Sequence, residues 1–168
     1  MYGEQCFLVN IGGQDMEKNQ IVNLTRDGVT RINILTGFNK KVNCQIDFYA
    51  VAFDAMEKGR VLEKQLLQEN KEKKKITVEL EKIGLEVQRI IFIDEIYAVD
   101  SASKAEPPYF KAVSNEKTWQ FDVDHEMGWH RVIIGFELYR YNNEWWLRSV
   151  GNSVSHRIFS LMKTEYNN

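Results

Sequence analysis

The sequence predicts an all-β fold, an antiparallel β-sandwich that ends in a short helix. Short segments rich in β-branched and aromatic residues recur along the chain, and turn signals separate them. Helical spacing is confined to two short stretches, and a strong β-hairpin pattern lies near the C-terminus. The 168 residues include only two prolines and suffice for one globular core, but are few for two. We therefore expect a single domain over residues 1–168, built from about nine strands.

The composition predicts a soluble, cytoplasmic protein. The formal net charge of −2 gives no reason to expect a polyanion or a strongly anionic membrane as partner. Cys6 and Cys44 are the only cysteines and lie far apart in sequence, so we interpret them as reduced thiols. The first residues lack the basic region of a signal peptide, and no apolar run is long enough to span a membrane.

The hairpin pattern predicts its own register. Asn142 and Asn143 tolerate the positive φ of a two-residue turn. Such a turn sets residues at equal distances from it opposite each other. Four of the five resulting pairs are chemically complementary: an opposite-charge pair, an aromatic pair, a guanidinium over an indole, and two leucines. The pairs are Tyr141 with Glu144, Tyr139 with Trp146 and Glu137 with Arg148 on one face, and Arg140 with Trp145 and Leu138 with Leu147 on the other.

The other strands are predicted from alternation and from turns such as Arg26–Gly28. Cys44–Phe53 is apolar on both faces, which predicts a central strand, and Asp47 is a carboxylate near its beginning. Residues 1–15 are a candidate extra N-terminal strand, at Cys6–Ile11. The remaining expected strands are Gln20–Leu24, Thr30–Thr36, Ile76–Leu80, Arg89–Ala98, Tyr109–Val113, Thr118–Val123 and Val132–Phe136.

Two stretches have helical spacing. In the connection 56–75 the leucines are spaced as in a helix, with Glu, Lys, Gln and Asn between them, which indicates either a short helix within 60–75 or a solvated segment. These leucines are Leu62, Leu66 and Leu67. Residues 155–165 fit a terminal helix with Ser155 as its N-cap and an apolar stripe that packs on the sheet. The stripe consists of Ile158, Leu161 and Met162.

Three blocks of the sequence resemble the tellurium-resistance TerD family. Gly135–Gly151, GFELYRYNNEWWLRSVG, is similar to the family's C-terminal signature, GELYR-x-NGEW-K-F-R-A-V-G. Asn19–Asn39 resembles its N-terminal strands, and Ile46–Asp54 resembles its DLDASAFLLD strand. Their order is specific for the fold and less so for the activity. The resemblance implies a cytosolic stress-response protein linked to tellurite resistance, often calcium-binding, that acts in assemblies at the cytoplasmic membrane.

The resemblance raises calcium binding as a hypothesis. TerD relatives carry an Asp- and Gly-rich loop that resembles a calcium-binding loop, whereas here the interval 61–76 is much shorter and contains no Asp. The divergent connection 56–75 therefore replaces that acidic loop. We expect calcium binding to be weak or lost, with solvated carboxylates in its place. The alternative is a genuine calcium-binding member that uses Asp47, Asp122, Asp124 and Glu126, which match two family elements.

The motifs of an enzyme or a transition-metal site are missing from the sequence. The cysteines and histidines form no CxxC, HxH or HExxH spacing. No Gly-x-Ser-x-Gly element or Gly-rich phosphate loop occurs. We therefore expect a non-enzymatic protein with no cofactor, or with calcium as the only one.

The hairpin supplies a binding hypothesis. Trp146 stands where TerD relatives usually carry Lys, next to Tyr139 and between Glu137 and Arg148. If exposed, this face is an aromatic patch rimmed by charge, which is typical of a protein interface. Such a face could also stack single-stranded nucleic acid, but the slightly acidic chain favours a protein partner or self-association. Alternatively, Trp146 packs under the terminal helix or the connection 56–75.

Overall fold

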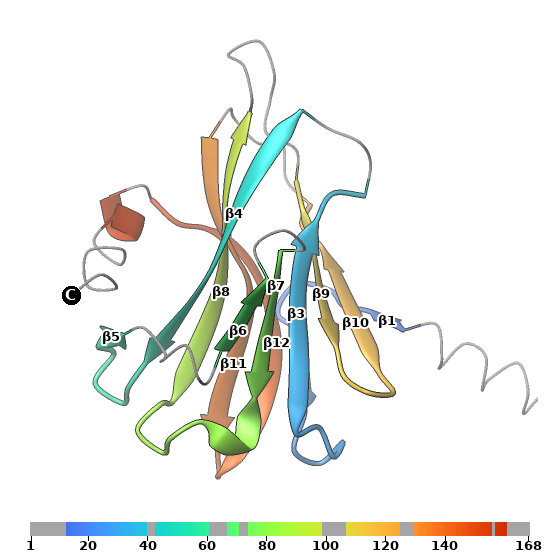
Figure 1. The fold of residues 1–168 in the computed structure, drawn as a ribbon, viewed down its shortest axis with the longest axis vertical. Helices are drawn as coiled ribbons and strands as arrows, with labels where there is room; N and C mark the ends of the chain where they lie inside the picture. Colours follow the sequence, from blue (N-terminus) through green and yellow to red (C-terminus); the bar gives the residue numbers. More distant parts are fainter. Residues whose placement is uncertain are drawn as a thin grey trace, which may run out of the picture.

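The computed structural model describes residues 13–39, 43–60, 67–70, 74–98, 107–124, 130–155 and 157–160. They form two six-stranded sheets packed face to face (Figure 1). Sheet A contains, in spatial order, β1 (Gln14–Asp15), β10 (Thr118–Asp122), β9 (Tyr109–Val113), β3 (Arg31–Gly37), β7 (Lys75–Glu79) and β6 (Leu67–Asn70). Sheet B contains β2 (Ile21–Asn23), β12 (Glu144–Ser153), β11 (His130–Tyr141), β8 (Arg89–Ala98), β4 (Cys44–Phe53) and β5 (Gly59–Arg60).

The sandwich predicted from the sequence is confirmed. The strand pairs are antiparallel, apart from the parallel pair of β1 and β10. A one-turn 3₁₀-helix, η1 (Leu80–Lys82), precedes β8, and residues 157–160 form a helical turn. Ser155 caps this turn, because the Ile158 N–H donates to its Oγ at 3.2 Å.

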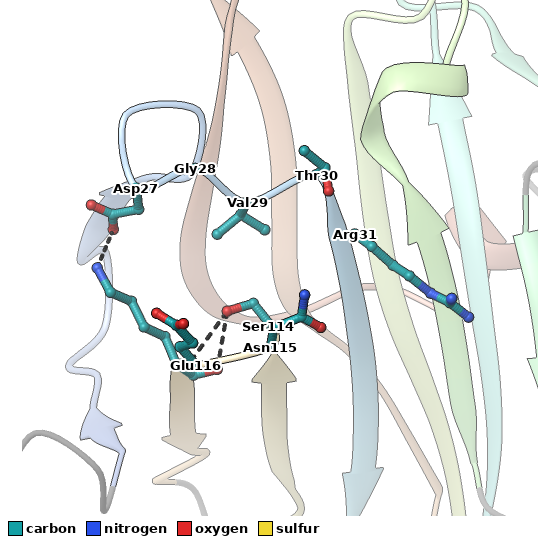
Figure 2. Close-up of a pocket in the computed structure, with 9 residues that line it drawn as sticks. Asp27, Gly28, Val29, Thr30, Arg31, Ser114, Asn115 and Glu116 are labelled. Atoms are coloured by element: carbon teal, nitrogen blue, oxygen red, sulfur yellow. Dashed lines mark hydrogen bonds and ion pairs between the residues drawn. The ribbon is translucent and has the colours of Figure 1, made fainter.

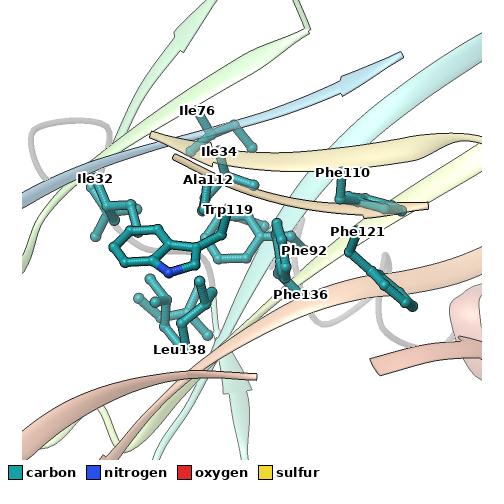
Figure 3. Packing of buried hydrophobic residues seen from close by; sticks show 14 of the residues in the cluster. Ile32, Ile34, Ile76, Phe92, Phe110, Ala112, Trp119, Phe121, Phe136 and Leu138 are labelled. Carbon is teal, nitrogen blue, oxygen red and sulfur yellow. The ribbon is translucent and has the colours of Figure 1, made fainter. Parts of the chain in front are cut away.

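The hydrophobic core lies between the two sheets, where longer strands such as β3 and β9 bury every second side chain. Figure 3 shows Phe110 and Phe121 from sheet A meeting Phe92 and Phe136 from sheet B. The rings of Phe110 and Phe136 are 6.1 Å apart between centroids and inclined at 67°, an edge-to-face contact. A Cβ on Gly135 would lie 2.3 Å from the Phe110 ring. Glycine at this β11 bulge therefore leaves room for the ring.

A second apolar cluster covers part of the outer face of sheet B. Phe159, in the C-terminal helical turn, packs on Tyr49 of β4 with ring centroids 5.3 Å apart. Phe159 is buried, whereas Ile158 is 51% exposed. The prediction that Ile158 packs on the sheet is wrong, because in this single turn Phe159 points to β4 and its neighbour points away. Leu161 and Met162 lie outside the described residues.

The position of β4 in sheet B differs from the prediction. It is apolar on both faces, as predicted, but it is not a central strand. β8 pairs along its whole length, while β5 pairs only with Ala52 and Phe53. Phe159 packs on the outer apolar face of β4, so this face is covered although the strand is not central. The two apolar faces of β4 therefore did not indicate which strands lie beside it.

The connection 56–75 contains strands where the structure describes it. β6 pairs antiparallel with β7, which satisfies its backbone without helical hydrogen bonds. The helical alternative is therefore wrong for residues 67–70, and Leu62 and Leu66 lie outside the described residues. The same holds for the predicted strand Cys6–Ile11, although β1 follows shortly after it.

Candidate functional site

The C-terminal hairpin has the register that its turn predicts. Asn142 and Asn143 have φ values of 52° and 59°, as a two-residue primed turn requires. All five pairs expected from the sequence are opposite each other, from Tyr141 with Glu144 to Glu137 with Arg148. The turn therefore decides which side chains share each face of this end of sheet B.

Arg140 ties the hairpin to the loop before β8. Its guanidinium donates to the carbonyl oxygens of Val87 and Ile83 at 2.8 Å and of Gly84 at 2.9 Å. The same group lies 4.3 Å from the centre of the Trp145 ring, which confirms the predicted guanidinium–indole pair. Burial lowers the pKa of Arg140 from its usual value. The inner residues of the hairpin thus hold this end of the sheet together.

On the outer side, the structure brings together the four residues predicted to form an interface. We call Tyr139, Trp146, Glu137 and Arg148 the hairpin face. The rings of Tyr139 and Trp146 are stacked, with centroids 6.4 Å apart and planes at 13°. Arg148 Nη2 lies 2.5 Å from Glu137 Oε2, and the Glu137 side chain is only 9% exposed. Burial raises the pKa of Tyr139, so its hydroxyl stays a neutral donor.

Arg89 of β8 and Phe53 of β4 extend the hairpin face, and the sequence did not reveal them; with these two residues we call it the extended hairpin face. Arg89 is opposite Tyr139 in the ladder, and its guanidinium lies 4.6 Å from the centre of the Phe53 ring. Its Nη2 also pairs with Glu57 at 2.6 Å. A row of aromatic and guanidinium groups therefore crosses sheet B from Trp146 to Phe53. Only the alignment of β8 with β11 places Arg89 there, and no local pattern encodes that alignment.

The extended hairpin face holds polar groups without partners. Among the described residues, four buried side-chain polar atoms lack a hydrogen bond. Three are N–H donors on this face: Arg89 Nε, Trp146 Nε1 and Arg148 Nε. Buried N–H donors usually have a hydrogen-bond acceptor, so three donors without one on a single face are unusual. The fourth atom, Asp94 Oδ1, lies between the sheets.

The predicted calcium ligands are distributed over two sheets. Asp47 is on β4 of sheet B, opposite Glu95. Asp122 ends β10 of sheet A, where it accepts hydrogen bonds from Asn39 and Gln120, both at 3.0 Å.

Asp124 is exposed just beyond β10, and Glu126 lies outside the described residues. In the described part of the chain, no three His, Cys, Asp or Glu side chains are grouped as a metal site would need. Calcium binding stays a prediction.

A small polar pocket lies between the β2–β3 and β9–β10 turns (Figure 2). Its volume is about 220 Å³, and Lys117 Nζ pairs with Asp27 Oδ2 at 3.3 Å on its wall. Figure 2 shows the Arg31 side chain directed away from the other lining groups. Asp27 and Lys117 are paired with each other, so these two charges of the pocket already have partners.

Comparisons with known proteins agree with the fold. A homologue of telluride resistance protein TerD, SCO6318 from Streptomyces coelicolor A3(2), superposes with a TM-score of 0.56 at 10% identity, over 79% of this chain and 96% of that one. SAV2460, described as a protein of unknown function, gives 0.54 at 13% identity, over 76% and 93% of the two chains. No curated protein sequence matches the chain.

No helix of the described residues is long and apolar enough to cross a membrane. The family model of the TerD domain matches residues 61–166, which include β6 to β12 and the whole hairpin face. That match covers more than half of the chain, and the three blocks quoted above follow the family order. The chain belongs to the TerD family.

Proposed function

We propose that this chain is a cytoplasmic stress-response protein of the tellurite-resistance type that binds another protein through the hairpin face. Membership of the TerD family supports the stress-response class. The proposed role is non-enzymatic, since the sequence lacks catalytic motifs. The family resemblance extends the proposal to assemblies at the cytoplasmic membrane.

The observation that carries the proposal is that the hairpin face combines two stacked aromatic rings with N–H groups that have no hydrogen-bond acceptor. Tyr139 and Trp146 form a flat, half-buried aromatic surface, and aromatic residues are enriched in interface cores. The unpartnered N–H groups of Trp146 and Arg148 would gain acceptors from a partner's carbonyl or carboxylate oxygens after a small side-chain rotation. Ile21, 50% exposed and opposite Arg148, extends the apolar area at the sheet edge.

The charges of the face favour a protein over a nucleic acid. Arg148 is paired with Glu137 and Arg89 with Glu57, so neither guanidinium is available as an uncompensated charge for a phosphate. The chain as a whole is slightly acidic. A protein surface, either of another protein or of a second copy, fits this neutral aromatic face better.

Calcium is proposed to bind weakly or not at all. Both hydrogen bonds to Asp122 Oδ1 come from amide groups, so this oxygen already has partners. Asp47 lies beside Glu95 in the other sheet, and the acidic loop of TerD relatives is missing from the sequence.

Photocrosslinking in cells tests the proposed interface. A benzophenone side chain in place of Trp146 should form a covalent adduct with one partner, or with a second copy, under tellurite stress. The same side chain in place of Leu85 is the matched control, because Leu85 is 78% exposed and lies outside the hairpin face. Adducts of equal yield and identity at both positions, or none at position 146, would contradict the proposal.

A further inference from the structure

The buried polar atoms without partners on the extended hairpin face are all hydrogen-bond donors, and this indicates which class of partner the face accepts. They are the N–H groups at Arg89 Nε, Trp146 Nε1 and Arg148 Nε. Among the buried side-chain atoms of the described residues, the one acceptor without a partner is Asp94 Oδ1, between the sheets. Burial raises the pKa of Tyr139, so its hydroxyl also stays a donor. A partner that matches this face supplies oxygen atoms and few N–H groups.

Three common kinds of partner do not match a face of donors. A helix uses most of its carbonyl groups in its own hydrogen bonds, and a β-strand presents N–H and C=O groups in equal number. A carboxylate suits a guanidinium, but Arg148 already pairs with Glu137 at 2.5 Å, and Arg89 pairs with Glu57 at 2.6 Å. A polyproline II segment does match, because its backbone makes no internal hydrogen bonds and each proline has a carbonyl but no N–H.

We infer that the extended hairpin face binds a proline-rich segment of another protein in the polyproline II conformation. This inference rests on the proposed function and names the class of its partner. Tyr139 and Trp146 are half-buried, and their rings are nearly parallel, with 13° between the planes. Proline rings pack on such aromatic surfaces, and the preformed backbone of the segment lowers the entropic cost of binding. The side chains of Arg148 and Arg89 are 40% and 32% exposed, so a rotation turns their N–H groups toward the carbonyl oxygens of the segment.

The row of side chains across sheet B sets the length of the segment. Trp146, Tyr139 and Arg89 are opposite one another in the ladders of β12, β11 and β8, and Asn23 of β2 is opposite Trp146 on its other side. These four strands span three spacings of about 4.8 Å, or about 14 Å in all. A polyproline II segment rises about 3.1 Å per residue, so about five residues cross the row.

Titration with a decaproline peptide tests this inference. Heteronuclear NMR of the full chain observes the indole N–H groups of its four tryptophans, and Trp146→Phe identifies the signal of Trp146. We expect decaproline to shift this signal downfield, because the N–H gains a carbonyl acceptor. Trp146→Phe keeps an aromatic ring but loses the N–H, so it should weaken binding about tenfold. Leu85→Ala, a change outside the extended hairpin face, should bind decaproline as tightly as the wild type.

Control peptides of the same length separate this partner from the others. A peptide of alternating glycine and serine has as many carbonyls but keeps its N–H groups and a flexible backbone, so equal affinity for it would overturn the inference. Tighter binding of decaglutamate would also overturn it, in favour of a carboxylate ligand. A wild-type dimer that is lost in Trp146→Ala would place a second copy on the face instead.

The wild-type spectrum keeps the test decisive even if Trp146→Phe is poorly folded. No shift of any indole signal at millimolar decaproline would overturn the inference without reference to a variant. If the crosslink at position 146 forms in cells but decaproline does not bind, the protein interface stands and only the class of partner is wrong. If that crosslink does not form, the proposed function itself fails.

Discussion

The substitution Arg140→Lys should destabilise the protein although it keeps the positive charge. Arg140 donates three hydrogen bonds to the carbonyls of Ile83, Gly84 and Val87, and it packs on Trp145. A lysine ammonium cannot reach all three carbonyls in the planar arrangement of a guanidinium. Hydrogen bonds to charged groups contribute about 1.5–3 kcal/mol each, and water will solvate part of the loop once it is released. We expect a net loss of about 2–4 kcal/mol in the free energy of unfolding.

Urea unfolding at fixed pH measures this loss. The midpoint should fall by about 1–2 M with an unchanged slope. Arg26→Lys is the matched control, because Arg26 is largely exposed and pairs with Glu144 at 3.3 Å, an interaction that contributes at most about 1 kcal/mol. If Arg140→Lys cost no more than Arg26→Lys, the anchoring role of Arg140 would be refuted.

Two other predictions concern the buried carboxyl group of Asp94 and the binding of calcium. Asp94 is fully buried, and burial raises its pKa, so from about pH 4 upward the folded state keeps a proton that the unfolded state loses. Its contribution to the free energy of unfolding is complete below the ordinary value of 3.8 and falls by up to about 1.4 kcal/mol per pH unit as the pH rises toward the folded-state pKa. Asp94→Asn should remove this slope in urea unfolding between pH 4.5 and 7, and parallel curves for the two proteins would contradict it. For calcium, the thermal unfolding temperature should not change between millimolar calcium and chelator; a site at about one hundred times its dissociation constant would add about 2.7 kcal/mol, and a rise lost in Asp47→Asn would establish the alternative calcium-binding role.

The sequence predicted the local part of the fold well. A two-residue turn fixes the register of the hairpin, so the pairing of Tyr139 with Trp146 could be predicted from spacing alone. The predicted strand Cys44–Phe53 has the same bounds as β4, because its mostly apolar, strand-forming residues continue to both ends of the strand. Its neighbours were not predictable, since strand order depends on contacts far apart in sequence. Residues 67–70 likewise form a strand, β6, because they pair with β7, and the sequence of this segment alone did not indicate that pairing.

The candidate site likewise has a part that the sequence predicts and a part that only the structure shows. The four hairpin residues meet because one turn places them. Arg89 and Phe53 join them because β4, β8 and β11 happen to be neighbours in sheet B, and no local pattern of the sequence encodes that order. The unpartnered indole N–H of Trp146 depends on its surroundings in three dimensions, so it too is visible only in the structure.

Complementation in cells tests the central claim most directly, that function depends on the hairpin face. A host that lacks its own copy of this chain would receive the wild type, Trp146→Ala or Leu85→Ala at matched protein levels, and growth on tellurite would be measured. We predict that the wild type and Leu85→Ala protect the host while Trp146→Ala does not, although all three unfold at similar temperatures. Protection by Trp146→Ala equal to that of the wild type, or no protection by the wild type itself, would contradict the account.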